Sequence, residues 1–110
     1  MICETADGQD AVEKAEQLLP DLVLLDIGLP TISGIEAARE IRKVSPRSRI
    51  LFLSQHDSLH MANAAMKVGG HGYVTKIDAS SELLRAIQSV RDGMHFVSRR
   101  IRDQGWTPEV

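Results

Sequence analysis

The sequence has little of what marks secreted, membrane-spanning or nucleic-acid-binding chains. Its 110 residues include one cysteine, Cys3, so no internal disulfide can form and a reducing compartment is expected. No apolar run approaches the roughly 20 residues that cross a bilayer, and no leader segment follows Met1. Lys and Arg total 13 against 15 Asp and Glu, and this net charge of -2 gives no sign of a basic surface for nucleic acid. We therefore expect a cytoplasmic chain with neither a membrane nor a directly bound nucleic acid as partner.

What the chain does contain is a regular alternation of short apolar runs with amphipathic stretches. Hydrophobic residues make up 43% and charged residues 25%, as in an ordinary single globular domain. The apolar runs are too short for helices and indicate buried strands, whereas the amphipathic stretches repeat at helical spacing. The expected strands are Ile2–Ala6, Leu22–Leu25, Ile50–Leu53 and Gly72–Val74, and the expected helices are Asp10–Leu19, Ile35–Arg42, Ser58–Lys67 and one from Ser80 or Ser81 to Gly93.

Strands that alternate with helices predict an α/β fold, with a parallel, doubly wound sheet and helices on both of its faces. In such folds the chemistry lies at the carboxyl ends of the strands. Asp26, Ser54 and Lys76 each follow one of the apolar runs directly. We therefore expect a carboxylate, a hydroxyl and an ammonium group to lie together at one edge of the sheet.

These three groups suit phosphoryl transfer. A carboxylate can attack phosphorus and become an aspartyl phosphate. An ammonium and a hydroxyl group can then bind the phosphoryl oxygens, and magnesium normally neutralises the remaining charge. Taken singly, Asp26, Ser54 and Lys76 are more simply explained as a turn former, a hydroxyl turn and a solvated charge. Their joint placement favours the functional interpretation.

Around these residues the chain resembles the receiver domain of bacterial two-component response regulators. The sequence of these motifs is most similar to receivers that carry a LuxR-type effector. The resemblance extends from about Ile2 to Val97, which predicts a receiver domain over residues 1–97 and a tail or linker over 98–110. The matching segments are Ala6–Gly8 with Ala11, Pro20–Pro30, Ser33–Glu36, Ile50–Ser54 and Gly72–Lys76.

The resemblance implies a flavodoxin-like (CheY-like) fold and a signalling role in a phosphorelay. Asp26 would accept a phosphoryl group from a sensor histidine kinase, and Lys76 would contact that group. Ser54 and Tyr73 would form the switch that responds to it. The domain would be a phospho-acceptor rather than an enzyme in its own right.

The sequence departs from the family at its start, which matches the second strand of a receiver. The family's first strand carries an acidic pair that holds magnesium, and no such pair is found here. Asp26 is then the one metal ligand of the motif, and a single carboxylate makes a poor magnesium site. We expect weak magnesium binding and poor phosphorylation of this chain.

The same departure affects the sheet, because the family's strand order places the first strand in the middle. We expect a gap between Ile2–Ala6 and Leu22–Ile27 with unpaired backbone groups on both sides. Direct pairing of the two strands, a second chain in the slot, domain swapping, or a biological start upstream of Met1 would each resolve it. Of these we favour a homo-oligomer, most simply a dimer.

Two other functions stay open. A degenerate receiver would act only as a protein-interaction or dimerisation module without phosphorylation. A phosphatase with an Asp nucleophile usually needs a second Asp two positions later, where this chain has Gly28. In the tail, Arg99, Arg100 and Arg102 are expected to be solvated and Trp106 to be exposed.

Overall fold

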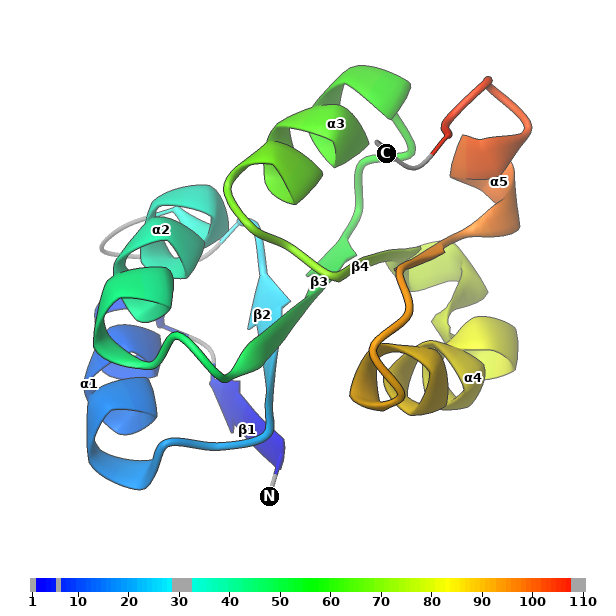
Figure 1. The fold of residues 1–110 in the computed structure, drawn as a ribbon. Coiled ribbons are helices and arrows are strands. Elements are labelled where there is room, and N and C mark those ends of the chain that lie inside the picture. The colour runs from blue at the N-terminus through cyan, green and yellow to red at the C-terminus, as the bar shows by residue number, and fades with distance from the viewer. Residues whose placement is uncertain (1, 6, 29–32, 108–110) are drawn as a thin grey trace.

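The structure is a computed structural model, and it describes residues 2–5, 7–28 and 33–107 (Figure 1). Leu29 and Pro30 of the expected loop, and Ala6 of the expected first strand, lie outside the described residues. The elements are β1 (Ile2–Thr5), α1 (Gly8–Leu18), β2 (Leu22–Asp26), α2 (Gly34–Val44), β3 (Arg49–Ser54), α3 (Leu59–Lys67), β4 (Gly72–Thr75), the 3-10 helix η1 (Lys76–Asp78), α4 (Ala79–Arg91), β5 (Phe96–Val97) and α5 (Arg99–Arg102).

The sheet has five parallel strands in the order β1-β2-β3-β4-β5. Helices α1, α2 and α3 pack on one face, and α4 packs on the other (Figure 1). The first four residues of β2 are all buried, as the continuous apolar run predicts for a strand covered on both faces. The predicted α/β class is confirmed.

The expected gap in the sheet is wrong for the described residues. Strand β1 pairs directly with β2 in parallel register, with Ile2 opposite Leu22 and Thr5 opposite Leu25. The backbone groups expected to be unpaired between these strands are therefore bonded within one molecule, which was one of the four resolutions. The expected gap was the physical reason for placing a second chain between these strands, and that reason no longer applies. Homo-oligomerisation stays a prediction.

Helix α1 accommodates this pairing because its inner face carries small side chains. Ala11 and Ala15 are completely buried against the sheet and α2. Leu19, the predicted last residue of this helix, instead follows its end at Leu18, is 64% exposed and adopts a left-handed backbone conformation just before Pro20. The helix begins at Gly8, two residues before the predicted Asp10, because the Asp7 carboxylate caps its first turn by accepting hydrogen bonds from the backbone N–H groups of Gln9 and Asp10.

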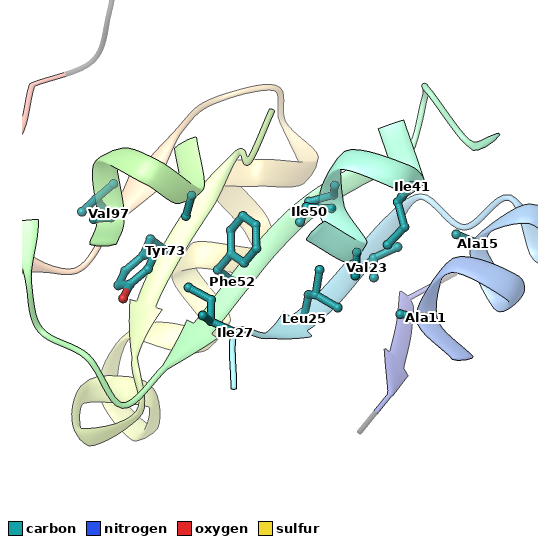
Figure 2. Packing of buried hydrophobic residues seen from close by; sticks show 14 of the residues in the cluster. Ala11, Ala15, Val23, Leu25, Ile27, Ile41, Ile50, Phe52, Tyr73 and Val97 are labelled. Atoms are coloured by element: carbon teal, nitrogen blue, oxygen red, sulfur yellow. The ribbon is translucent and has the colours of Figure 1, made fainter. Parts of the chain in front are cut away.

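The main core lies between the sheet and helices α1 to α3. Figure 2 shows Val23, Leu25, Ile50, Phe52 and Tyr73 projecting from three neighbouring strands into one apolar layer. A smaller cluster on the opposite face joins the sheet to α4 through Leu24, Leu51, Val74, Ala86 and Val90, among others. None of the described helices has the length and apolar character needed to span a membrane.

The segment after Val97 is not the solvated tail that the sequence suggested. Ser98 and Ile101 have no exposed surface, and Ile101 belongs to the main core. Strand β5 extends the sheet beside β4, and α5 follows it directly. Trp106, expected to be exposed, is partly buried against the same core. The boundary at Val97 itself stays a prediction.

Ile101→Ala should destabilise the whole domain. The substitution removes a buried side chain from the main core, and changes of this type cost about 2–5 kcal/mol. Urea unfolding followed by circular dichroism measures the effect. The control is Arg99→Gln, because the Arg99 side chain is 81% exposed, and it should change the free energy of unfolding by less than about 0.5 kcal/mol. If the two variants have equal free energies of unfolding, the segment after Val97 does not contribute to the core and the interpretation as a solvated tail is correct.

The stability of the fold should also depend on His71, next to β4. Burial, reinforced by the charges of Arg42, His95 and Arg49, lowers the pKa of His71 to about 4. Its Nδ1 accepts a hydrogen bond from the Ile50 N–H, which protonation of Nδ1 would remove. The unfolded chain takes up this proton near pH 6.5, so the free energy of unfolding falls as the pH drops from about 6.5 to about 4.

His71→Asn should flatten that dependence, because asparagine does not titrate and offers an acceptor oxygen. The measurement is urea unfolding at a series of pH values from 4 to 7 for the wild type, for His71→Asn and for a control variant. The control is His60→Asn, which changes an exposed histidine of α3. If His71→Asn and the wild type lose stability in parallel over that range, His71 is not the group responsible.

Candidate functional site

Asp26 is the last residue of β2 and lies at the carboxyl edge of the sheet. Its carboxylate is held on two sides. Oδ2 lies 2.5 Å from the Lys76 ammonium nitrogen, and Oδ1 accepts a hydrogen bond from the Gly28 N–H at 2.9 Å. The side chain keeps 29% of its surface exposed. A solvent-borne reactant can therefore reach a carboxylate whose orientation is fixed.

The register of the sheet brings Lys76 to this place. Asp26 is opposite Leu53 of β3, and Leu53 is opposite Val74 of β4. Lys76 follows two residues after Val74, at the start of η1. Its side chain therefore reaches across the end of β3 to the carboxylate.

Helix α2 is packed tightly against the end of β2. The Gly34 N–H donates to the Ile27 carbonyl at 2.9 Å. A Cβ atom on Gly34 would lie 2.4 Å from the Asp26 carbonyl oxygen and 2.6 Å from the Ile27 Cα. Only glycine fits this approach, and the Ser33 hydroxyl caps the helix immediately before it. The sequence Ser33-Gly34 thus fixes the backbone beside Asp26.

The Asp26–Lys76 pair contributes little to stability. Both side chains are partly exposed, Lys76 by 38%, and such pairs are typically worth roughly 0.2–1 kcal/mol. The pair is therefore a minor contributor to the stability of the fold.

Ser54 and Tyr73 lie together beside this site. Ser54, the last residue of β3, is 1% exposed, and its hydroxyl accepts a hydrogen bond from the His56 N–H at 3.0 Å. Tyr73 is completely buried and donates from its hydroxyl to the His56 carbonyl at 2.8 Å. Burial raises the pKa of Tyr73, and a hydrogen bond with Ser54 partly opposes that rise. The phenol points inward (Figure 2).

The structure therefore brings Asp26 and Lys76 into direct contact, and it joins Ser54 to Tyr73 through His56. The hydrogen bond from the His56 N–H to the Ser54 hydroxyl forms the turn that is the simpler explanation for a serine at this position. The roles of acceptor, phosphoryl contact and switch stay predictions.

The residues at this edge do not fit a magnesium ion. Both oxygens of Asp26 are already engaged, one by an ammonium group and one by an N–H. Among the described residues, no group of three or more His, Cys, Asp or Glu side chains could hold a metal ion. Magnesium needs several oxygen ligands in octahedral geometry, and a single carboxylate paired with a cation does not supply them.

Sequence analysis missed a polar network next to Lys76. Glu82 is 6% exposed, and its carboxylate accepts from the Ser98 hydroxyl at 2.6 Å and from the Arg99 N–H at 3.1 Å. Asp78 pairs with Arg100 at 3.1 Å. The signal in the sequence is Glu82 on the first turn of an amphipathic helix, but its position there does not show that the carboxylate faces the segment after β5.

Comparison with known proteins identifies the family. The response regulator receiver domain family matches residues 1–88. The transcriptional activator protein ExaE of Pseudomonas putida is 33% identical over 92% of this chain and 47% of its own length. The response regulator UvrY of Escherichia coli is 32% identical over 94% of this chain and 48% of its own. The chain thus spans about half the length of these curated relatives.

Solved structures agree with this result. A LuxR-family two-component response regulator from Aurantimonas superposes with a TM-score of 0.85 at 35% identity, over 90% of this chain and 71% of the other. The response regulator domain of Thermotoga maritima CheB gives a TM-score of 0.70 at 30% identity, over 78% of this chain and 72% of the other. The chain belongs to the response regulator receiver domain family, in the group of LuxR-family two-component regulators.

Proposed function

We propose that this chain is a receiver module of a phosphorelay, in which Asp26 accepts a phosphoryl group from the phosphohistidine of a sensor histidine kinase. The observation that carries the proposal is the contact of 2.5 Å between Asp26 and Lys76 at the carboxyl edge of the sheet. Family membership supports it, since receiver domains act in signalling and the relatives are transcriptional regulators. Cys3 is a free thiol, in keeping with a cytoplasmic location.

The proposed transfer forms one bond and breaks another. An Asp26 oxygen attacks phosphorus while the bond between phosphorus and the donor histidine nitrogen breaks, and the released imidazole takes up a proton. Lys76 then turns from the carboxylate to the phosphoryl oxygens, where an ammonium group is electrostatically favourable. Gly28 contributes its N–H to Oδ1 and orients the carboxylate. We further propose that Ser54 and Tyr73 respond to this change as the switch.

A degenerate receiver is the second candidate, and a specific observation favours it. The described residues contain no cluster of acidic groups beside Asp26, so the charge of an incoming phosphoryl group is met by Lys76 without a metal site. In this alternative the same surface would serve only for protein interaction or dimerisation. The position two residues after Asp26 is Gly28, which has no side chain to act as a general acid, and this speaks against an Asp-based phosphatase.

Phosphorylation of the chain by acetyl phosphate distinguishes these functions. We expect slow labelling, detected by intact-protein mass spectrometry, with little acceleration by magnesium because the site offers one carboxylate. Asp26→Asn should abolish the labelling. The matched control is Asp21→Asn, which removes an exposed carboxylate just before the opposite end of β2 and should leave labelling unchanged.

Three results distinguish a phospho-accepting receiver from a degenerate one. Slow labelling that disappears in Asp26→Asn supports a working acceptor. No labelling of the wild type at any magnesium concentration supports the degenerate receiver. Rapid magnesium-dependent labelling contradicts our expectation that a site with one carboxylate binds magnesium poorly.

A further inference from the structure

The residues on either side of Lys76 are held by the segment that follows β5. Thr75 precedes Lys76 and is buried, and its N–H donates to the Ser98 hydroxyl oxygen at 3.0 Å. Asp78 ends the 3-10 helix that Lys76 begins, and its carboxylate accepts from the Arg100 guanidinium at 3.1 and 3.4 Å. Ser98 and Arg100 thus form hydrogen bonds with the residues at both ends of the turn that carries Lys76.

A buried carboxylate makes this fastening cooperative. Glu82 accepts from both the Ser98 hydroxyl and the Arg99 N–H. If the segment moved away, the Glu82 carboxylate would lose both partners, and leaving a buried charge unpaired is costly. The contacts of the segment therefore form or break together rather than one at a time.

The second fastening is tied to the first through Thr75. Its hydroxyl donates to Asp78 Oδ2 at 2.5 Å, so Asp78 is shared between Thr75 and Arg100. The Arg100 guanidinium and the Thr75 hydroxyl lower the pKa of Asp78. The strand carbonyl of Tyr73 also accepts from the Ser98 N–H at 2.9 Å.

We propose that Ser98 and Arg100 are positioning residues for Lys76, and that the docking of the 98–102 segment is coupled through them to the charge carried at Asp26. The coupling is reciprocal, as any linkage between two sites must be. A loosened segment would shift Lys76, and a changed charge at Asp26 would pull on Lys76 and hence on Thr75 and Asp78. The inference deepens the proposed function, because it takes Asp26 as the acceptor whose charge changes.

Nuclear magnetic resonance of the full chain tests the coupling in both directions without a phosphodonor. The first variant, Arg100→Gln, breaks the pair with Asp78, and its Arg100 side chain is 44% exposed, so the fold is expected to persist. We expect the Lys76 Nζ signal and the Thr75 amide signal to shift. The second variant, Asp26→Asn, removes the charge facing Lys76, and we expect the amide signals of Thr75 and Arg99 to shift.

A neighbouring arginine provides the matched control. Arg99 lies next to Arg100 in α5, but its guanidinium faces Asp103 at 3.9 Å. Arg99→Gln removes the same charge and should leave the Lys76 Nζ signal in place. Arg100→Lys restores a cation opposite Asp78 and should return the Lys76 signal part of the way, which a general loss of structure would not do.

The inference is overturned if Arg100→Gln moves the Lys76 Nζ signal no more than Arg99→Gln does. It is also overturned if the shifts caused by Asp26→Asn stop at Lys76 and do not reach Thr75 and Arg99. Failure of the proposed function is a separate result, since it would appear as the absence of labelling at Asp26 in the phosphodonor experiment.

Discussion

The parallel register of β2, β3 and β4 is the constraint on which the rest of the structure depends. With Asp26 opposite Leu53 and Ser54 opposite Thr75, the three strands end at one edge within a residue or two of each other. Side chains that are 50 residues apart in the sequence, Asp26 and Lys76, therefore meet at 2.5 Å. A slip of one residue in either pairing would turn the buried side chains to the opposite face and separate the two charges.

The residues that pack the helices against the sheet differ from those that form polar contacts around Lys76. Packing relies on small residues, with Ala11 and Ala15 under α1 and Gly34 against the end of β2. Polar contact relies on residues that follow β4 and β5, where Glu82 and Asp78 hold the backbone around Lys76. The apolar contacts hold the sheet and its helices together, while the polar contacts hold Lys76, which faces Asp26.

The sequence was sufficient to predict β1 to β4, most of the helices and the meeting of Asp26 with Lys76, because each rests on a local pattern and on the rule for strand ends. The two-residue strand β5 was not predicted. The gap beside β1 was predicted wrongly, because it assumed that β1 keeps the place it has in the family's strand order. The burial of Ile101 was missed because α5 has four residues, too few to show a helical period. Hydrogen bonds such as Ser98 to Glu82 join separate elements and leave no trace in local spacing.

The most direct test of the account is a zero-length carbodiimide cross-link between Asp26 and Lys76, identified by tandem mass spectrometry after digestion. The helical pair Lys14 and Asp10, 3.0 Å apart and four residues from each other, serves as the internal control. We predict that both cross-links form in the native chain, and that in concentrated urea the cross-link between Asp26 and Lys76 is lost while the local one remains. A native chain that yields the Lys14–Asp10 product without the Asp26–Lys76 product would contradict the site.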